Sequence, residues 1–190
     1  MQDIIKADLK ESIDLKNQVL KELVPKIESA ARMLIMALKA GNKILLCGNG
    51  GSAADSQHLA TEIVSRYKKD RKPLAAIALS TDTSILTAVG NDYGFEYIFA
   101  RQVEALGKKG DVLIGISTSG ESKNVVEAMK AARSLGLRTI GLLGCAGGSI
   151  GEAVDLAIVV PCKNTPRIQE AHITIGHILC DLIERELFSA

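Results

Sequence analysis

Apolar side chains recur at helical spacing along the first 40 residues. The positions three and four residues apart are Ile4, Ile5, Leu9 and Ile13, and then Ile27, Ala30, Ala31, Leu34, Ile35 and Leu38. This spacing predicts helix over residues 3–40, with Pro25 in the first turn of a second helix and Gly41 as a C-terminal stop. The helices would either pack on the chain's own core or cover a neighbouring subunit, and the pattern leaves both open.

Five short apolar runs follow, separated by stretches with helical spacing. They occupy residues 43–47, 74–79, 111–116, 137–143 and 155–160. Continuous apolar runs of this length are typical of parallel strands that are buried on both faces. A last helix is expected over residues 166–187. The order predicts an α/β fold, a three-layer α/β/α sandwich around a five-stranded parallel sheet. We expect a single domain over residues 1–190, with extra N-terminal helices at 1–40 and the core and C-terminal helix at 41–190.

Composition and charge exclude several classes of protein. The chain is 47% hydrophobic and 24% charged, and its net charge of +1 gives no basic footprint for nucleic acid. No apolar run reaches the ~18 residues that cross a bilayer, and the charged N-terminus is unlike a secretory signal. Cys47, Cys145, Cys162 and Cys180 are widely spaced with no CxxC pair, which indicates reduced, mostly buried thiols. We therefore expect a cytoplasmic protein without nucleic-acid or membrane partners.

Two polar loops follow predicted strands and lead into predicted helices. The first is Gly48-Asn49-Gly50-Gly51-Ser52, and the second runs from Ser117 through Thr118, Ser119, Gly120 and Glu121 to Ser122. Free backbone N–H groups, the helix dipole and the serine hydroxyls favour an anion at such a position. Ordinary helix capping by Ser52, Ser119 or Ser122 is the alternative. Two such loops at the ends of parallel strands indicate a phosphorylated ligand, and neither loop matches a dinucleotide or nucleoside triphosphate motif.

All three histidines lie on two of the predicted helices. His58 and Glu62 stand four residues apart on the helix that opens at the glycine loop, where a surface ion pair is the simpler explanation. The C-terminal helix carries His172 and His177. A step of five residues separates them by ~140° around the helix, so we expect one of the two to be structural.

Four segments in this order carry a resemblance to a known family. They are "CGNGGSAADSQHLATEI", "VGNDYGFEYIF", "GDVLIGISTSGES" and "RIQEAHITIGH". The chain resembles the sedoheptulose-7-phosphate isomerases, or phosphoheptose isomerases, of the sugar isomerase (SIS) fold superfamily. The resemblance implies one zinc ion per subunit on His58, Glu62, Gln169 and His177. It implies substrate contacts at Asn49, Gly50, Gly51, Glu62, Asn91, Asp92, Ser117, Thr118, Ser119, Ser122 and Gln169, and makes His172 the structural histidine.

The resemblance also implies a reaction. Aldose–ketose isomerisation moves a proton between C1 and C2 through a cis-enediol, and a carboxylate and an imidazole suit that task. By similarity to the family, Glu62 is the catalytic base and His177 its acid/base partner. The implied product is D-glycero-D-manno-heptose 7-phosphate, an early intermediate toward heptoses of lipopolysaccharide and other cell-surface glycans. Pro166, where some relatives carry an Asp, is a departure whose effect the resemblance does not give.

The sequence leaves two other functions open. Related SIS-fold proteins regulate by binding the replication initiator or a sugar phosphate, but they lose parts of the zinc and acid/base set that this chain keeps. An isomerase of a pentose or hexose phosphate would carry similar phosphate loops.

The spacing of Gln169 and His177 bears on assembly. Eight residues separate them by ~12 Å along a helix and ~80° around it, so binding one ion from a single chain would be awkward. A simpler arrangement takes one of them from a neighbouring subunit. The apolar stripe of the C-terminal helix and the long N-terminal helix would form the interface. Relatives are tetramers, and we expect an obligate homotetramer with active sites near subunit interfaces.

Overall fold

A computed structural model describes residues 1–188, and its centre is a parallel five-stranded sheet with the strand order β2-β1-β3-β4-β5. The strands are β1 (Ile44–Gly48), β2 (Ala76–Ala78), β3 (Val112–Ser117), β4 (Arg138–Leu143) and β5 (Leu156–Val159). In register, Leu46 lies between Ala78 of β2 and Ile114 of β3. Every residue of β1 and β3 is buried, because helices cover both faces of the sheet.

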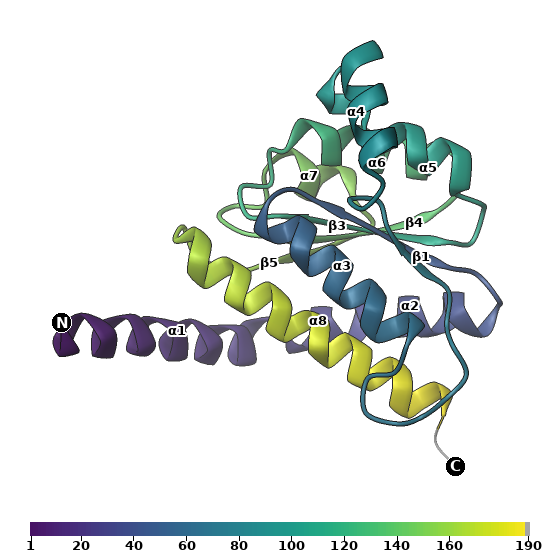
Figure 1. Ribbon diagram of the computed structural model, residues 1–190. Coiled ribbons are helices and arrows are strands. Elements are labelled where there is room, and N and C mark those ends of the chain that lie inside the picture. Colours follow the sequence, from purple (N-terminus) through teal and green to yellow (C-terminus); the bar gives the residue numbers. More distant parts are fainter. Residues whose placement is uncertain (189–190) are drawn as a thin grey trace.

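The helices form two layers around this sheet (Figure 1). One layer contains α1 (Gln2–Glu22), α2 (Val24–Lys39), α3 (Gly51–Val64) and α8 (Thr165–Leu187). The other contains α5 (Ala100–Leu106), α6 (Lys123–Ser134) and α7 (Gly148–Ala153), while α4 (Thr83–Asp92) lies on the short 3-10 helix η1 (Phe95–Tyr97) outside α6. Alternate strand residues face opposite layers, so Leu46 and Ile114 pack with the first and Leu45 and Leu113 with the second.

This architecture confirms the predicted three-layer α/β/α sandwich. The second helix begins with Pro25 at its second residue, and Gly41, with φ +78°, follows its end. The apolar run at 74–79 was predicted to be a strand, but the strand covers only Ala76–Ala78. It is an edge strand paired only with β1, so half of its backbone groups have no neighbouring strand.

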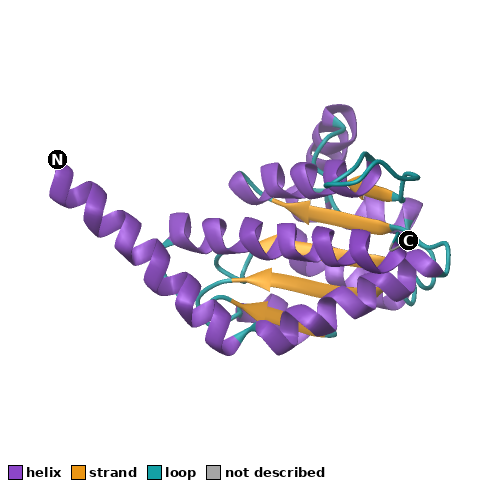
Figure 2. Cartoon of the chain, turned by 90° about the horizontal axis from the view of Figure 1, so that it is seen from below, coloured by secondary structure: helices purple, strands orange, loops and turns teal. Residues whose placement is uncertain are grey.

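Helix α1 covers the core with only part of its length. Leu15 and Val19 are its buried residues, and its N-terminal half projects beyond the sheet (Figure 2). The exposed apolar residues of α1 are Ile4, Ile5, Leu9, Ile13 and Leu20, each at least 53% exposed. The chain alone therefore leaves a large part of the predicted apolar stripe uncovered.

The cysteines differ in part from expectation. Cys47 and Cys180 are buried, Cys162 is half-buried, and Cys145 is exposed on the turn after β4. The prediction of mostly buried thiols therefore holds for two of the four. Within residues 1–188, no helix combines the length and the apolar character that a bilayer crossing requires.

The strand order also locates the crevice in which such sheets bind ligands. The connection after β1 crosses one face through α3, and the connection after β3 crosses the other face through α6. The two connections diverge at the carboxyl ends of β1 and β3, which is the topological switch point of a doubly wound sheet. Both predicted phosphate loops begin there.

Candidate active site

The glycine loop after β1 is shaped by residues without side chains. Gly50 has φ +54° and ψ −121° and forms the N-cap of α3 with no side-chain cap. A Cβ on Gly48 would stand 2.7 Å from the carbonyl oxygen of Ser52, so this turn requires glycine. Ser52 is 4% exposed, and its side chain does not cap α3. The backbone N–H groups of Ser52 and Ala53 donate within this turn, to the carbonyl oxygens of Asn49 and Gly50. Among residues 1–188, those of Gly50 and Gly51 have no backbone acceptor, and they are the ones that an anion could use.

In the serine loop after β3, three hydroxyl groups converge. The Oγ atom of Ser117 lies 3.0 Å from that of Ser122 and 3.4 Å from that of Ser119. The backbone N–H of Gly120 donates to Ser117 Oγ over 3.2 Å. Ser122 stands at the N-cap of α6, yet its side chain makes no cap hydrogen bond. The capping explanation therefore fails for Ser122, and its hydroxyl points into the loop.

The two loops are tied together by a reciprocal amide pair. Asn49 Nδ2 donates to Asn124 Oδ1 over 2.9 Å, and Asn124 Nδ2 donates to Asn49 Oδ1 over 2.8 Å. Asn124 is 3% exposed in the first turn of α6. Beside this pair lies a hollow of about 200 Å³ lined by Asn49, Phe95, Glu96, Ser122, Lys123 and Asn124. The sequence prediction missed Asn124, which fixes the glycine loop against the serine loop.

Asn91 and Asp92 lie at the exposed C-terminal end of α4. Asn91 Nδ2 donates to Asp92 Oδ1 over 2.7 Å. In the described part of the chain, no hydrogen bond joins either side chain to the glycine or serine loop. Thr118, in the serine loop, packs closely on Gly144. A Cβ on Gly144 would stand 2.5 Å from the carbonyl oxygen of Thr118.

Helices α3 and α8 run side by side in the same direction and approach closely at two glycines (Figure 1). At the head of α3, a Cβ on Gly51 would stand 2.3 Å from Gln169 Nε2. Near its middle, a Cβ on Gly176 would stand 2.5 Å from Leu59 Cδ2. The first contact puts the side chain of Gln169 at the glycine loop. The second brings α8 against α3 at the level of His58.

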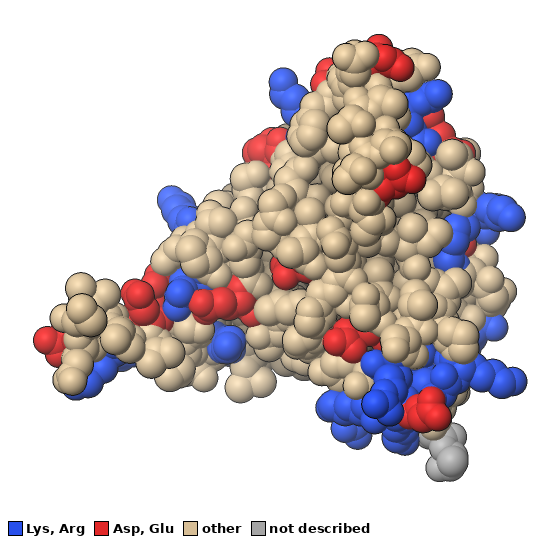
Figure 3. All heavy atoms as spheres, in the orientation of Figure 1, with Lys and Arg blue, Asp and Glu red and all other residues tan. Residues whose placement is uncertain are grey.

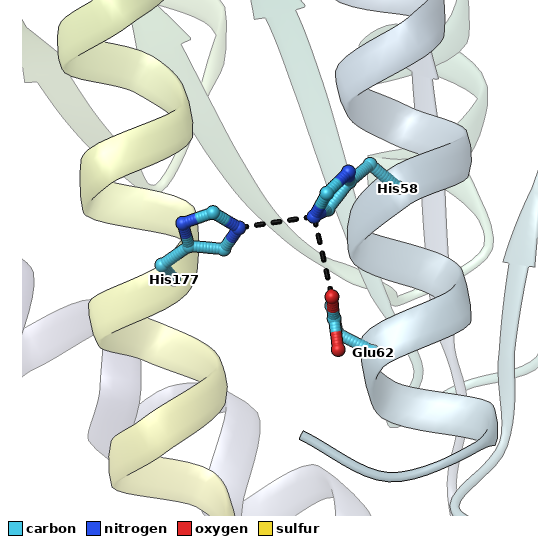
Figure 4. Close-up of side chains that lie close together, drawn as sticks. All are labelled: His58, Glu62 and His177. Carbon is cyan, nitrogen blue, oxygen red and sulfur yellow. Dashed lines mark hydrogen bonds and ion pairs between the residues drawn. The ribbon is translucent and has the colours of Figure 1, made fainter. Parts of the chain in front are cut away.

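At this second level, His58, Glu62 and His177 come together within one chain (Figure 4). The two Nε2 atoms of His58 and His177 are 3.0 Å apart, and His58 Nε2 is 3.2 Å from Glu62 Oε1. The Glu62 side chain is 23% exposed and that of His58 48%, so the group is open to solvent at one side. The ring of Tyr67 packs on His177 with a centroid distance of 5.8 Å.

These three side chains have the donor set and spacing of a divalent metal site. Tetrahedral zinc with nitrogen and oxygen ligands places its donor atoms about 3.3 Å apart, close to the 3.0 and 3.2 Å separations around His58 Nε2. All three donor atoms lie within 4.8 Å of one another. Imidazole nitrogens with a carboxylate oxygen suit zinc and several other divalent ions. The residues therefore fit a metal ion, although the geometry does not select zinc.

Asp55 is a buried carboxylate near the two histidines that the sequence analysis missed. One Oδ atom is buried without a hydrogen-bond partner among residues 1–188. Burial raises the pKa of Asp55, while the nearby His58 and His177 act in the opposite direction. Asp55 precedes His58 by three residues on the same side of α3, and that spacing was the available signal.

His172 is separate from the group and confirms the expectation of one structural histidine. It is fully buried, and its Nε2 lies 3.0 Å from the carbonyl oxygen of Leu143 at the end of β4. Burial lowers the pKa of His172 to about 4, and the bond to Leu143 only partly offsets this. His172 is therefore neutral at neutral pH and joins α8 to the sheet.

Comparison with known proteins agrees with this fold. Residues 9–144 match the SIS domain family, and the chain belongs to the SIS-domain proteins. It is 55% identical over 190 residues to a phosphoheptose isomerase of Clostridium acetobutylicum, covering 99% of this chain and 97% of the relative. It is 59% identical over 184 residues to a phosphoheptose isomerase of Geotalea daltonii, covering 97% and 96%.

A solved structure gives the same result. The phosphoheptose isomerase of Neisseria gonorrhoeae superimposes with a TM-score of 0.92 at 48% identity, covering 96% of this chain and 98% of that one. Within the SIS-domain proteins, the chain thus belongs to the phosphoheptose isomerase family and is an isomerase. The predicted family is confirmed.

Proposed function

We propose that this chain converts sedoheptulose 7-phosphate into D-glycero-D-manno-heptose 7-phosphate, the first step toward activated heptose for lipopolysaccharide and other surface glycans. The observation that carries the proposal is that α3 begins at the glycine loop and also bears His58 and Glu62, which meet His177 of α8 further along. His58 lies seven residues, about 10 Å, beyond Gly51 along that helix. This separation is comparable with the span of an extended seven-carbon sugar phosphate.

The two loops would hold the phosphate end of the substrate. Backbone N–H groups at Gly50 and Gly51 and the hydroxyls of Ser117, Ser119 and Ser122 are the donors for its oxygens. Thr118, Asn49, Asn91 and Asp92 complete the proposed sugar contacts. Fixing the phosphate orients the carbon chain, so the carbonyl end reaches the side chains of α3 and α8 in one register.

Glu62 and His177 would carry the proton chemistry. Glu62 takes the proton from C1 or C2 and returns it to the neighbouring carbon, so a cis-enediol is formed and consumed. His177 gives and takes the proton at the substrate oxygen on the other side. Donor atoms of His58, Glu62 and His177 lie within 4.8 Å of one another, which supports one shared site on a single chain.

We further propose that His58, Glu62 and His177 hold one zinc ion per subunit, with Gln169 as a fourth ligand. When bound, such an ion polarises the substrate carbonyl as a Lewis acid. Gln169 of α8 lies against Gly51 at the N-terminal end of α3 in the same chain. This position is about 10 Å along α3 from His58. Since His177 reaches His58 within one chain, Gln169 is the residue that a neighbouring subunit would supply.

A homotetramer with a single SIS domain per chain, residues 1–190, is the proposed assembly. The exposed residues Ile4, Ile5, Leu9 and Ile13 of α1 support it, because an exposed apolar stripe favours association. The cytoplasmic location stays a prediction, as do the expected absences of nucleic-acid and membrane partners.

The direct test is an assay of the purified protein with sedoheptulose 7-phosphate. We expect formation of the aldose phosphate, loss of turnover after treatment with a chelator, and recovery with zinc. Pentose and hexose ketose phosphates serve as comparison substrates. Turnover of one of these in place of the heptose would contradict the substrate assignment, and full activity after complete metal removal would contradict the role of zinc.

A further inference from the structure

The loop after α3 is fastened to the C-terminal half of α8 by one buried carboxylate. Glu184 is 2% exposed. Its two oxygens accept from the backbone N–H groups of Tyr67, Lys68 and Lys69 over 3.0, 2.9 and 2.9 Å, and from Arg71 Nε over 3.1 Å. Burial alone would raise the pKa of Glu184, but these donors outweigh it and the pKa is lowered. The carboxylate is therefore charged and fully engaged.

The partner of this carboxylate reaches back to α3. Arg71 Nη2 donates to the carbonyl oxygen of Glu62 over 2.8 Å, and Arg71 Nη1 donates to that of Ile63 over 3.0 Å. Both carbonyls belong to the last turn of α3, which ends at Val64 and has no helical donors left for them. A cation at this end also opposes the negative pole of the helix. Arg71 thus closes the end of α3 and links it to Glu184.

These contacts fix two groups beside His177. The first is Glu62, whose own carbonyl oxygen is the acceptor for Arg71. The second is Tyr67, whose backbone N–H is bound by Glu184 and whose ring packs on His177. Glu184 stands seven residues after His177, two turns along the same face of α8. One ion pair therefore connects the elements that carry Glu62, Tyr67 and His177.

The burial of the pair argues for a role in geometry. The side chains of Arg71 and Glu184 are 2% and 3% exposed. Taking two charges out of water offsets much of their attraction, so a buried ion pair adds little net stability over apolar residues of similar volume. Apolar residues could not replace the directional hydrogen bonds of this pair. Glu184 accepts from three loop N–H groups, and Arg71 donates to two carbonyl oxygens of α3.

We propose that Arg71 and Glu184 are positioning residues for the isomerase site, holding Glu62 and Tyr67 in register with His177. The inference rests on the proposed function, in which Glu62 and His177 bind the metal and transfer the proton. Arg71 and Glu184 act through these side chains and are not catalytic residues themselves. They would set metal affinity and turnover, while the phosphate loops at the other end of α3 set the KM for the substrate.

The test compares Glu184→Gln with a matched control, Asp111→Asn. Asp111 is also 2% exposed. It accepts from Lys43 N over 2.9 Å, from Lys108 N over 2.8 Å and from the Lys43 ammonium, and none of these donors belongs to α3, α8 or the loop between α3 and β2. Zinc affinity is measured by competition with a coloured chelator, and kcat and KM with sedoheptulose 7-phosphate.

Supporting residues around a metal site typically change affinity or activity about 10–100-fold. We expect losses of about that size in zinc affinity and kcat for Glu184→Gln, with KM changed less than about twofold. Asp111→Asn should retain both, although it lowers the free energy of unfolding. Arg71→Lys, which keeps the charge but loses the two-pronged contact with α3, should give an intermediate loss. It also serves as the test variant if Glu184→Gln does not fold.

Two results would overturn the inference. One is wild-type zinc affinity and kcat in folded Glu184→Gln and Arg71→Lys proteins. The other is an equal loss in Asp111→Asn, which would show general destabilisation. If the wild type failed to turn over sedoheptulose 7-phosphate, the proposed function would fail, whereas the zinc titration would still decide whether the pair positions the site.

Discussion

Gly176 packs directly on Leu59, in a space where a Cβ would stand 2.5 Å from the leucine Cδ2 atom. The absence of a side chain allows α8 to contact α3 at the level of His58 and His177. The imidazole nitrogens of these histidines, 3.0 Å apart, depend on that close approach. The proposed metal binding and proton transfer by His177 thus require a glycine at the preceding position, Gly176.

Glu62→Gln tests the proposed base. The amide keeps the size of the side chain and one oxygen ligand but removes the group that accepts the proton. We expect kcat to fall by about two to four orders of magnitude, with binding of the phosphorylated sugar largely retained. Single-turnover kinetics and zinc content are the measurements. A variant with full zinc content and near-native kcat would show that the proton is taken elsewhere.

The serine loop makes a separate prediction about substrate binding. Replacing Ser117, Ser119 or Ser122 by Ala removes one donor to the phosphate, and each loss should cost about 1 kcal/mol, or about fivefold in KM. Ser134→Ala is the control, because Ser134 is exposed and its hydroxyl donates to the carbonyl oxygen of Ala131 in its own helix, far from both loops in the sequence. Unphosphorylated sedoheptulose should be a poor substrate. Equal turnover of the free sugar would contradict the assignment of both loops.

The low pKa of His172 predicts that the free energy of unfolding decreases in mild acid. Its folded-state pKa of about 4 lies below the ordinary value of 6.5, so in this window the unfolded chain binds a proton that the folded chain does not. The stabilisation is complete above pH 6.5 and is lost as the pH falls toward 4, by up to about 3 kcal/mol. Denaturant unfolding at fixed protein concentration measures it.

His172→Gln supplies the comparison for that experiment. Glutamine can donate to the Leu143 carbonyl but does not titrate, so its free energy of unfolding should depend less on pH between 6.5 and 4. Parallel pH profiles for the two proteins would mean that His172 is not the group responsible.

Mixing two inactive variants tests whether subunits share a site. His177 meets His58 within one chain, while Gln169 lies at the head of its own α3. If Gln169 serves the site of a neighbour, tetramers assembled from Gln169→Ala and His177→Ala chains would contain some complete sites and regain activity. Glu62→Gln mixed with His177→Ala should not recover, because those residues share one chain. Absence of rescue in the first mixture would assign Gln169 to its own subunit.

Much of the fold could be predicted because its central strands, β1 and β3, are buried on both faces. The runs that became β1 and β3 are mostly apolar, and Pro25 marked the second helix. The edge strand β2 was overextended, since pairing on one side is a tertiary property. Ile77 at its centre is 38% exposed, which its apolar sequence did not indicate.

The site was predicted where its chemistry lies within one segment. His58 and Glu62 are four residues apart and the loops are continuous, so spacing was informative. Arg71 and Glu184 are separated by 113 positions, and no local pattern connects an arginine in a loop with a glutamate near the chain end. Asn49 and Asn124 were missed as a pair for the same reason. The fold, rather than spacing, brings such partners together.

Helix α8 fixes four contacts at once, because it is one uninterrupted helix of 23 residues. Gln169 touches the glycine loop, His172 the end of β4, His177 the side chain of His58, and Glu184 the loop after α3. Inserting a single residue after His172 would leave the first two contacts in place but rotate the other two by about 100°. This helix should therefore accept many exchanges of side chain during evolution while tolerating almost no change in its length.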